Sequence, residues 1–281
     1  MRQLLVKTFF LGLLLSLAHQ SYAQLQISLE AQRDTFLLYE PIVFKLTVTN
    51  TSASPIALTE NPGSKRPWLA FQIFRADRTK VSAVDGYSVP SQIVDPGQST
   101  TLEVNITPLY RIRSSGQYDI QAVVQVPGGR SFITTRLRFH IGIGEVGWSE
   151  DVLMNGVTRK YSLIRFLESK KSALYLRVEE PDENLVYTTT RLGSVVGFTQ
   201  PQVQFDANGE LHILHISAST LHRYTHASAE GAILYREDRQ ALPGAAPRLV
   251  EQNGGKVMVA GGVDMKGKQK RRKLSEDQLG L

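Results

Sequence analysis

Residues 41–50 read PIVFKLTVTN, and the apolar side chains Ile42, Phe44, Leu46 and Val48 occupy every second position. This two-residue period is typical of a strand with one buried face. Similar segments, separated by turn residues, recur over 25–29, 56–59, 68–75, 100–106, 116–126 and 130–141. Roughly seven short strands without a helical period predict that residues 24–143 form a sandwich of two antiparallel sheets.

Two motifs in this region carry a family resemblance. The stretch 35–50, TFLLYEPIVFKLTVTN, resembles the opening strands of bacterial immunoglobulin-like and macroglobulin-type domains, and Asp95–Ser99 with Gly116–Ile120 resembles their second half. The resemblance implies an immunoglobulin-like sandwich in which the Tyr118 hydroxyl caps backbone at the crossing between sheets. Because such modules bind, space or inhibit, it implies no single function, and a protease-inhibitor-like module is one alternative.

The first 23 residues have the pattern of a signal peptide. Arg2 and Lys7 precede an apolar run over 9–18. After the run, Ser21-Tyr22-Ala23 offers small residues at the −3 and −1 positions of a cleavage site. The run is about half of the roughly 20 residues that span a bilayer, and we expect no transmembrane segment elsewhere. We therefore expect an exported protein, periplasmic or secreted, that begins at Gln24 after cleavage.

The net charge of +6 comes from the two ends of the chain, because the signal peptide carries +2 and residues 266–281 carry +4. The remainder is neutral, which argues against the basic face that nucleic-acid binding requires. We expect 266–281 to be a disordered basic tail. The alternative is electrostatic docking to an acidic envelope surface through Lys268, Lys270, Arg271, Arg272 and Lys273. The chain has no cysteine, which excludes disulfides and thiolate metal sites.

Residues 150–265 contain an internal repeat. Pro201–Val203 leads through Asn208-Gly209 to Leu211–Ile213, and 46 residues later 247–249 lead through a Gly-Gly pair to 257–259. A weaker copy at Leu174–Leu176 precedes Leu211 by 37 residues. Such periods are typical of propeller blades, and 205–215, FDANGELHILH, resembles a blade of the sialidase-like propellers. The length suits about two and a half blades, whereas closure takes at least four, so we expect a partial propeller, completed by self-association or another chain, or a second sandwich.

Four histidines, His212, His215, His222 and His226, lie within fifteen residues. A hairpin with a four-residue loop over 217–220 would place His215 opposite His222, with His226 further along the same face and His212 on the other. Two imidazoles make a weak metal site, so we expect no metal and no cofactor, and interpret these histidines as partly exposed sheet residues. The alternatives are a ligand-contact face that includes Tyr224, and a metal-assisted or glycan-active hydrolase centred on the His212–His226 hairpin.

Other catalytic patterns fail on spacing. Gly193–Gly197 places its serine one position too early for a nucleophile elbow, and the acidic cluster around Pro181 is typical of a solvated hairpin turn. The aromatic residues Trp68 and Trp148 are candidates for ligand contact or for core and linker packing. We therefore expect an all-β, non-enzymatic binding or assembly protein, with a linker at 142–149 and a protein or polysaccharide partner of the cell envelope or exterior.

Overall fold

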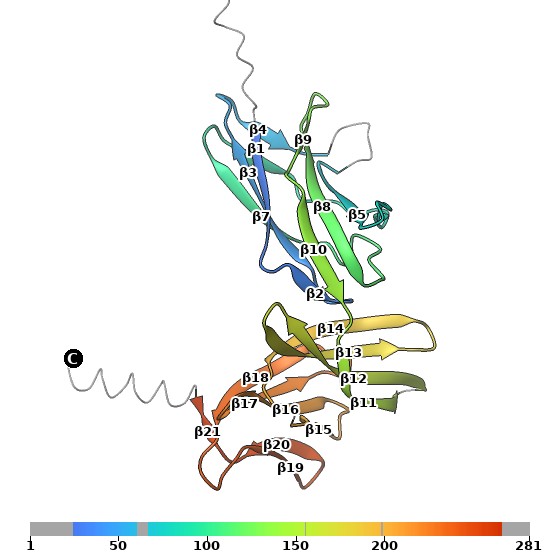
Figure 1. The fold of residues 1–281 in the computed structure, drawn as a ribbon, viewed down its shortest axis with the longest axis vertical. Helices are drawn as coiled ribbons and strands as arrows, with labels where there is room; N and C mark the ends of the chain where they lie inside the picture. Colours follow the sequence, from blue (N-terminus) through green and yellow to red (C-terminus); the bar gives the residue numbers. More distant parts are fainter. Residues whose placement is uncertain (1–24, 61–66, 155, 198, 266–281) are drawn as a thin grey trace, which may run out of the picture.

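The computed structural model describes residues 25–60, 67–154, 156–197 and 199–265, which form twenty-one strands and no helical element. The expected signal peptide and basic tail lie outside these residues. Within the described ranges, no helix is long and apolar enough to cross a membrane. Figure 1 shows two regions, which we call the sandwich (25–142) and the blade stack (145–264). The prediction of an all-β chain is confirmed.

The sandwich consists of two main sheets. The first contains β1 (Leu25–Ala31), β3 (Val43–Asn50) and β7 (Ser99–Asn105) in that order. The second has the order β2 (Thr35–Leu37), β10 (Leu137–Gly142), β8 (Gly116–Gln125) and β5 (Leu69–Arg75), with β9 (Ser131–Ile133) beside β8. A small separate sheet pairs β4 (Ile56–Leu58) with β6 (Gln92–Val94). The pairing of β2 with β10 is parallel, whereas the other strand pairs are antiparallel.

Alternation along the strands builds one core between these sheets. Phe44, Leu46 and Val48 of β3 are fully buried, and they meet apolar residues of β5, β8 and β10 in a single cluster. The Tyr118 hydroxyl donates to the carbonyl oxygen of Ser114 at 2.7 Å, which confirms the backbone cap predicted for it. The sequence pattern therefore predicts strands such as β3, β5 and β8, because each of them buries one face.

The blade stack consists of two consecutive antiparallel meanders and a hairpin (Figure 1). The first blade contains β11 (Glu145–Met154), β12 (Val157–Glu168), β13 (Lys171–Glu180) and β14 (Leu185–Ser194). The second blade contains β15 (Gln202–Phe205), β16 (Leu211–Ala218), β17 (Leu221–Ala227) and β18 (Ile233–Gln240), with β21 (Val263–Asp264) added beside β18. The terminal hairpin pairs β19 (Arg248–Gln252) with β20 (Lys256–Ala260). This arrangement is propeller-like and amounts to two blades and the start of a third.

The first and second blades each pack against a neighbour on both faces, and the terminal hairpin packs on one face. One face of the first blade contacts Leu37 of the sandwich through Ile164, Phe166 and Tyr175. Its other face packs on the second blade through Leu163, Leu174, Leu176, Leu211 and Ile213. The second blade packs on the terminal hairpin through Leu214, Tyr224, Leu249, Val257 and Val259. The order of layers is therefore sandwich, first blade, second blade, terminal hairpin.

The strand pairing tests the repeat and the linker. Val203 pairs with Ile213 in the second blade, and Leu249 pairs with Val259 in the terminal hairpin, so the 46-residue repeat relates equivalent positions. The weaker copy relates the third strand of one blade to the second strand of the next. The expectation of a linker at 142–149 is wrong, because β11 begins at Glu145, and Trp148 packs partly buried in the core between the blades.

Candidate functional site

The register of β16 against β17 decides which histidines meet. The strands are joined by the two-residue turn 219–220, and Ser217 is an extra residue between the pairs Ile216–His222 and Ala218–Leu221. His212 therefore lies opposite His226, and His215 lies opposite Arg223. The prediction that His215 faces His222 across a four-residue loop is wrong by one residue. Such a shift moves a side chain to the other face of the sheet.

The four histidines divide between the two faces of the second blade. His215 points to the first blade, where its Nε2 lies 3.2 Å from the carbonyl oxygen of Ser194. Burial lowers the pKa of His215 to about 4, so the ring is neutral at pH 7. His222 is half-buried opposite Ile216, and burial also lowers its pKa. Neither residue joins a ligand-binding group with His226.

The opposite face, toward the terminal hairpin, carries a compact polar group that we call the histidine pocket: Asp206, Glu210, His212, Tyr224 and His226. The two imidazole rings stack with their centroids 4.3 Å apart. His212 Nδ1 lies 2.7 Å from the Tyr224 hydroxyl, and His226 Nε2 lies 2.7 Å from Glu210 Oε2. Asp206 Oδ2 lies 3.5 Å from His212 Nε2. Each histidine is thus oriented by a different partner.

Two turns form the mouth of the pocket. Asp206 Oδ1 accepts the backbone N–H groups of Asn208 and Glu210, both at 2.9 Å, which turns Oδ2 toward His212. Ala207 N–H donates to the Gly255 carbonyl oxygen at 3.1 Å. Gly255 has φ +72°, and a Cβ there would lie 2.9 Å from the Ala207 Cβ, so the close approach requires glycine. With Lys256, these turns line an open cavity of about 430 Å³.

The environment sets the charges of the pocket. Burial and the neighbouring His226 lower the pKa of His212. Although burial favours the protonated form of Asp206, hydrogen bonds from the backbone N–H groups of Glu210 and Asn208 outweigh this effect. The pKa of Asp206 therefore lies below its usual value. Burial raises the pKa of Tyr224 to about 12. At pH 7 the pocket therefore places a neutral imidazole of His212 beside an ionised carboxylate.

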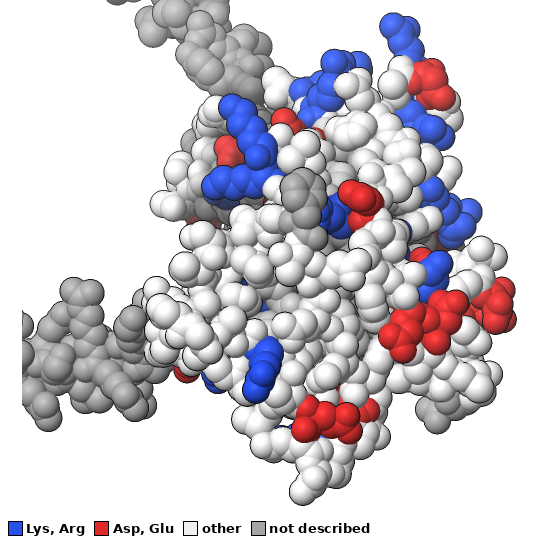
Figure 2. All heavy atoms as spheres, turned by 60° about the horizontal axis from the view of Figure 1, so that its bottom comes forward, with Lys and Arg blue, Asp and Glu red and all other residues white. Residues whose placement is uncertain are grey.

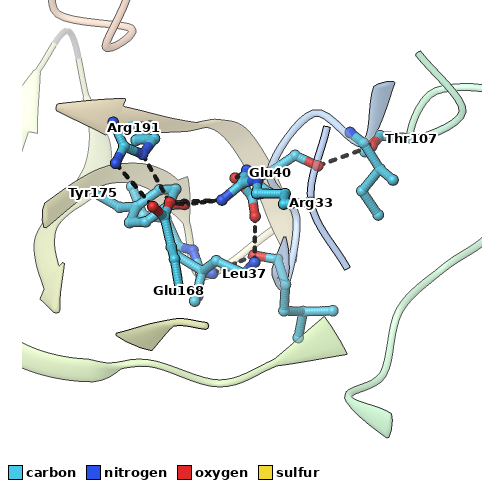
Figure 3. Close-up of polar contacts among 10 residues, drawn as sticks. Arg33, Leu37, Glu40, Thr107, Glu168, Tyr175 and Arg191 are labelled. Carbon is cyan, nitrogen blue, oxygen red and sulfur yellow. Dashed lines mark hydrogen bonds and ion pairs between the residues drawn. The ribbon is translucent and has the colours of Figure 1, made fainter. Parts of the chain in front are cut away.

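A second polar group, the junction network, joins the sandwich to the first blade (Figure 3). Arg33 of the sandwich donates to Glu168 at 2.6 Å and to the Tyr175 hydroxyl at 2.7 Å, and it also pairs with Glu40. Arg191 donates to both oxygens of Glu168 at 2.7 and 2.8 Å. Although burial favours the protonated form of Glu168, the hydrogen bonds from Arg191 and Tyr175 outweigh this effect and hold its pKa below the usual value. These charges hold the two regions in one orientation.

A groove of about 820 Å³, the junction groove, opens beside this network. The sandwich contributes Val84, Arg111 and Arg113 to its lining, and the first blade contributes residues of the β13–β14 turn and the start of β14. Leu185 and Val84 are 45% and 38% exposed there. A neighbouring hollow of about 340 Å³ continues along Val186–Thr189. Within the described sheet β14 is an edge strand, which pairs with β13 on one side.

The remaining candidates from the sequence lie elsewhere. Trp68 is 1% exposed in the sandwich core, and its Nε1 lies 3.2 Å from the carbonyl oxygens of Val89 and Pro90, so its ring offers no face to a ligand. Lys268, Lys270, Arg271, Arg272 and Lys273 lie outside the described residues. Figure 2 shows Lys and Arg interspersed with Asp and Glu on the face that it displays.

Several residues of both sites escape sequence reasoning. Asp206 stands two residues before Asn208-Gly209, and this Asp-x-Asn-Gly turn was the available signal for the mouth of the histidine pocket. The partners of the junction network, Arg33 and Glu168, are 135 residues apart and carry no comparable signal.

Comparisons with known proteins do not assign the chain to a family. No protein-family model matches it, and no curated protein matches it. The sporulation control protein Spo0M of Bacillus subtilis aligns with 58% of this chain and 83% of its own, at 9% identity and a TM-score of 0.29. A SafA pilin–SafB chaperone complex of Salmonella enterica aligns with 76% of this chain and 96% of its own, at 11% identity and a TM-score of 0.25. With scores this low, neither likeness carries a conclusion, and the immunoglobulin-like and sialidase-like resemblances are not confirmed.

Proposed function

We propose that this chain is a non-enzymatic binding or assembly protein that acts outside the cytosol and captures an extended segment of a partner protein in the junction groove. The observation that carries the proposal is an edge strand, β14, that lines an open groove. An extended segment beside an edge strand gains main-chain hydrogen bonds, while its alternate side chains enter neighbouring pockets. The exposed side chains of Leu185 and Val84 supply the apolar contacts for such a segment.

The junction network supports this proposal because it fixes both walls of the groove. Glu40 and Glu168 are 2% and 14% exposed, and Arg33 bridges them across the boundary. Arg177 adds a second bridge by donating to the carbonyl oxygen of Leu38 at 2.5 Å. A groove with rigid walls binds more tightly, since less conformational entropy is lost when the partner docks.

The charges along the groove and the covered end of β14 limit where the partner segment binds. Arg111 and Arg113 line one wall, and Glu179 and Glu180 line the other, which favours one direction of the partner chain. Arg236 donates to the carbonyl oxygen of Arg191 at 2.6 Å and so covers the far end of the β14 edge. The segment therefore pairs with the first part of β14, near Leu185–Thr190.

Action outside the cytosol rests on the signal-peptide pattern of residues 1–23. The metal-assisted form of the hydrolase alternative, centred on the His212–His226 hairpin, took His215 and His222 as its facing pair, and in the pairing of β16 with β17 these two residues lie on opposite faces. Binding is thus the function that the described geometry supports best.

Selection of short peptides from a random display library on the full chain tests this proposal. Selected peptides should slow hydrogen exchange over 185–190, and Leu185→Lys should weaken their binding at least tenfold because a charge replaces the apolar contact. Leu153→Lys, at a 73% exposed position on β11, is the matched control and should bind normally. Peptides that bind Leu185→Lys equally well, or a library that yields none, would refute the proposal.

A further inference from the structure

We propose that Asp206, His212 and His226 form a site for one divalent transition-metal ion of the zinc class. This inference does not depend on the function proposed for the junction groove, because the histidine pocket lies on the face of the second blade that packs on the terminal hairpin. One ligand atom from each of the three residues lies within 4.8 Å of the other two. The register that separates His215 from His222 is also the register that brings these three together.

The distance between Asp206 and His212 fits a shared metal ion better than a hydrogen bond. Two ligands that lie about 2.1 Å from one tetrahedral ion are about 3.4 Å apart. Asp206 Oδ2 and His212 Nε2 are separated by 3.5 Å, which matches that spacing. The same distance exceeds the range of about 2.7–3.2 Å for N–H···O hydrogen bonds. The carboxylate and the ring therefore face each other at ligand spacing.

The buried Nε2 atom of His212 provides independent support. His212 is 3% exposed, and among the described residues its Nε2 has no hydrogen-bond partner. In the tautomer whose Nδ1 donates to the Tyr224 hydroxyl oxygen, Nε2 presents a lone pair toward the carboxylate of Asp206. Two electron-pair donors that face each other in a buried site repel unless a cation lies between them. A bound metal ion removes that cost and satisfies both groups.

The surroundings match those of metal sites in proteins. Ligating histidines usually contact a second polar group through the other ring nitrogen, which fixes the ring. Tyr224 does this for His212, and Glu210 contacts His226 at 2.7 Å. Two carboxylates against Lys256 leave an excess of negative charge around the pocket. Two imidazoles and one carboxylate suit zinc, and the open cavity leaves room for water as a fourth ligand.

The test is a calorimetric titration of zinc chloride into the full chain, prepared without a polyhistidine tag and stripped with a chelator. The wild-type protein should bind one equivalent, and cobalt(II) in its place should give the visible absorption of a tetrahedral site. Asp206→Asn and His226→Gln should each weaken zinc binding at least hundredfold. Glu210→Gln should weaken it about tenfold, since Glu210 orients His226.

His140→Gln is the control, because His140 is exposed on β10 and should contribute nothing. Circular dichroism and the melting temperature of each metal-free variant establish that it folds. Saturating zinc should raise the melting temperature of the wild type and of His140→Gln, but not that of Asp206→Asn. The proposal fails if the wild type binds no stoichiometric zinc, or if binding is lost in His140→Gln and retained in Asp206→Asn and His226→Gln.

Discussion

The sandwich and the blade stack bury different chemistry. The sandwich joins both of its main sheets in one apolar cluster, and its one described histidine, His140, is exposed. The stack is held by three smaller clusters, and it buries His212 and His215 within its second blade. The buried carboxylate of the sandwich, Glu40, is 2% exposed and lies where the sandwich meets the first blade. The buried Glu40, His212 and His215 therefore all lie at boundaries between layers, and the candidate metal site lies at one of these boundaries.

Removing a large apolar side chain from the sandwich should have the largest effect. Trp68→Ala should lower the free energy of unfolding by about 4 kcal/mol, because the fully buried ring leaves a cavity. Ile133→Ala, at a 53% exposed position of the same region, should change it by less than about 0.5 kcal/mol. Urea unfolding measures both. Equal effects would mean that Trp68 is not part of the core.

Acid should destabilise the stack through His215. Its folded pKa of about 4 lies below the unfolded value of 6.5, so the unfolded chain binds more protons between these two pH values. Stability should therefore be complete above pH 6.5 and should fall by roughly 3 kcal/mol as the pH drops to 4. Arg223, Asp238 and Arg236 are the charged groups that act on the ring, and their influence is smaller than that of burial.

The matched variant for this pH dependence is His215→Gln, which keeps an amide for the Ser194 carbonyl and cannot take up a proton. Its unfolding free energy should depend less on pH between 6.5 and 4 than that of the wild type. His140→Gln should retain the wild-type dependence. An unchanged slope in His215→Gln would show that this histidine is not held neutral.

Breaking the junction network should uncouple the unfolding of the sandwich from the unfolding of the blade stack. Arg33→Ala leaves Glu40, which is 2% exposed, without its charged partner, and should cost about 2 kcal/mol because Arg33 itself is 24% exposed. Calorimetry should then resolve two unfolding transitions where the wild type shows one. A single transition with unchanged midpoint would mean that the network does not couple the sandwich to the stack.

An ion pair on the sandwich surface should have the smallest effect. Arg138 is 69% exposed and donates to Asp119 at 3.0 Å, and Arg138→Ala should change the free energy of unfolding by less than about 0.5 kcal/mol. The same urea titration that is used for Trp68→Ala measures it. A loss as large as that of Arg33→Ala would remove the distinction between buried and exposed pairs in this chain.

Sequence patterns predicted the parts of the fold that depend on one chain segment at a time. The alternation of Ile42, Phe44, Leu46 and Val48 predicted a half-buried strand, and the 46-residue repeat predicted equivalent hairpins. Both predictions use only the order of residues within a segment and need no knowledge of how distant segments pair. The strand at 145–154 was missed because its alternation is weak and most of its residues are exposed.

The candidate sites depended on information that periodicity does not carry. The pairing of His212 with His226 depends on Ser217 being bulged out of the ladder, and no pattern distinguishes that register from the one with His215 opposite His222. The junction network depends on how the sandwich docks on the first blade, which places Arg33 beside Glu168. Long-range docking of this kind is set by the shape of two completed surfaces.

The bulge at Ser217 holds the histidine pocket in register. If Ser217 paired with β17 instead and the two-residue turn were kept, every side chain of β17 would exchange faces relative to β16. His226 would then point at the first blade, and Arg223 would point at the terminal hairpin. Deleting this one residue should therefore remove the bulge and leave His212 opposite His226, whereas inserting a residue beside it should require a wider bulge to keep the pocket.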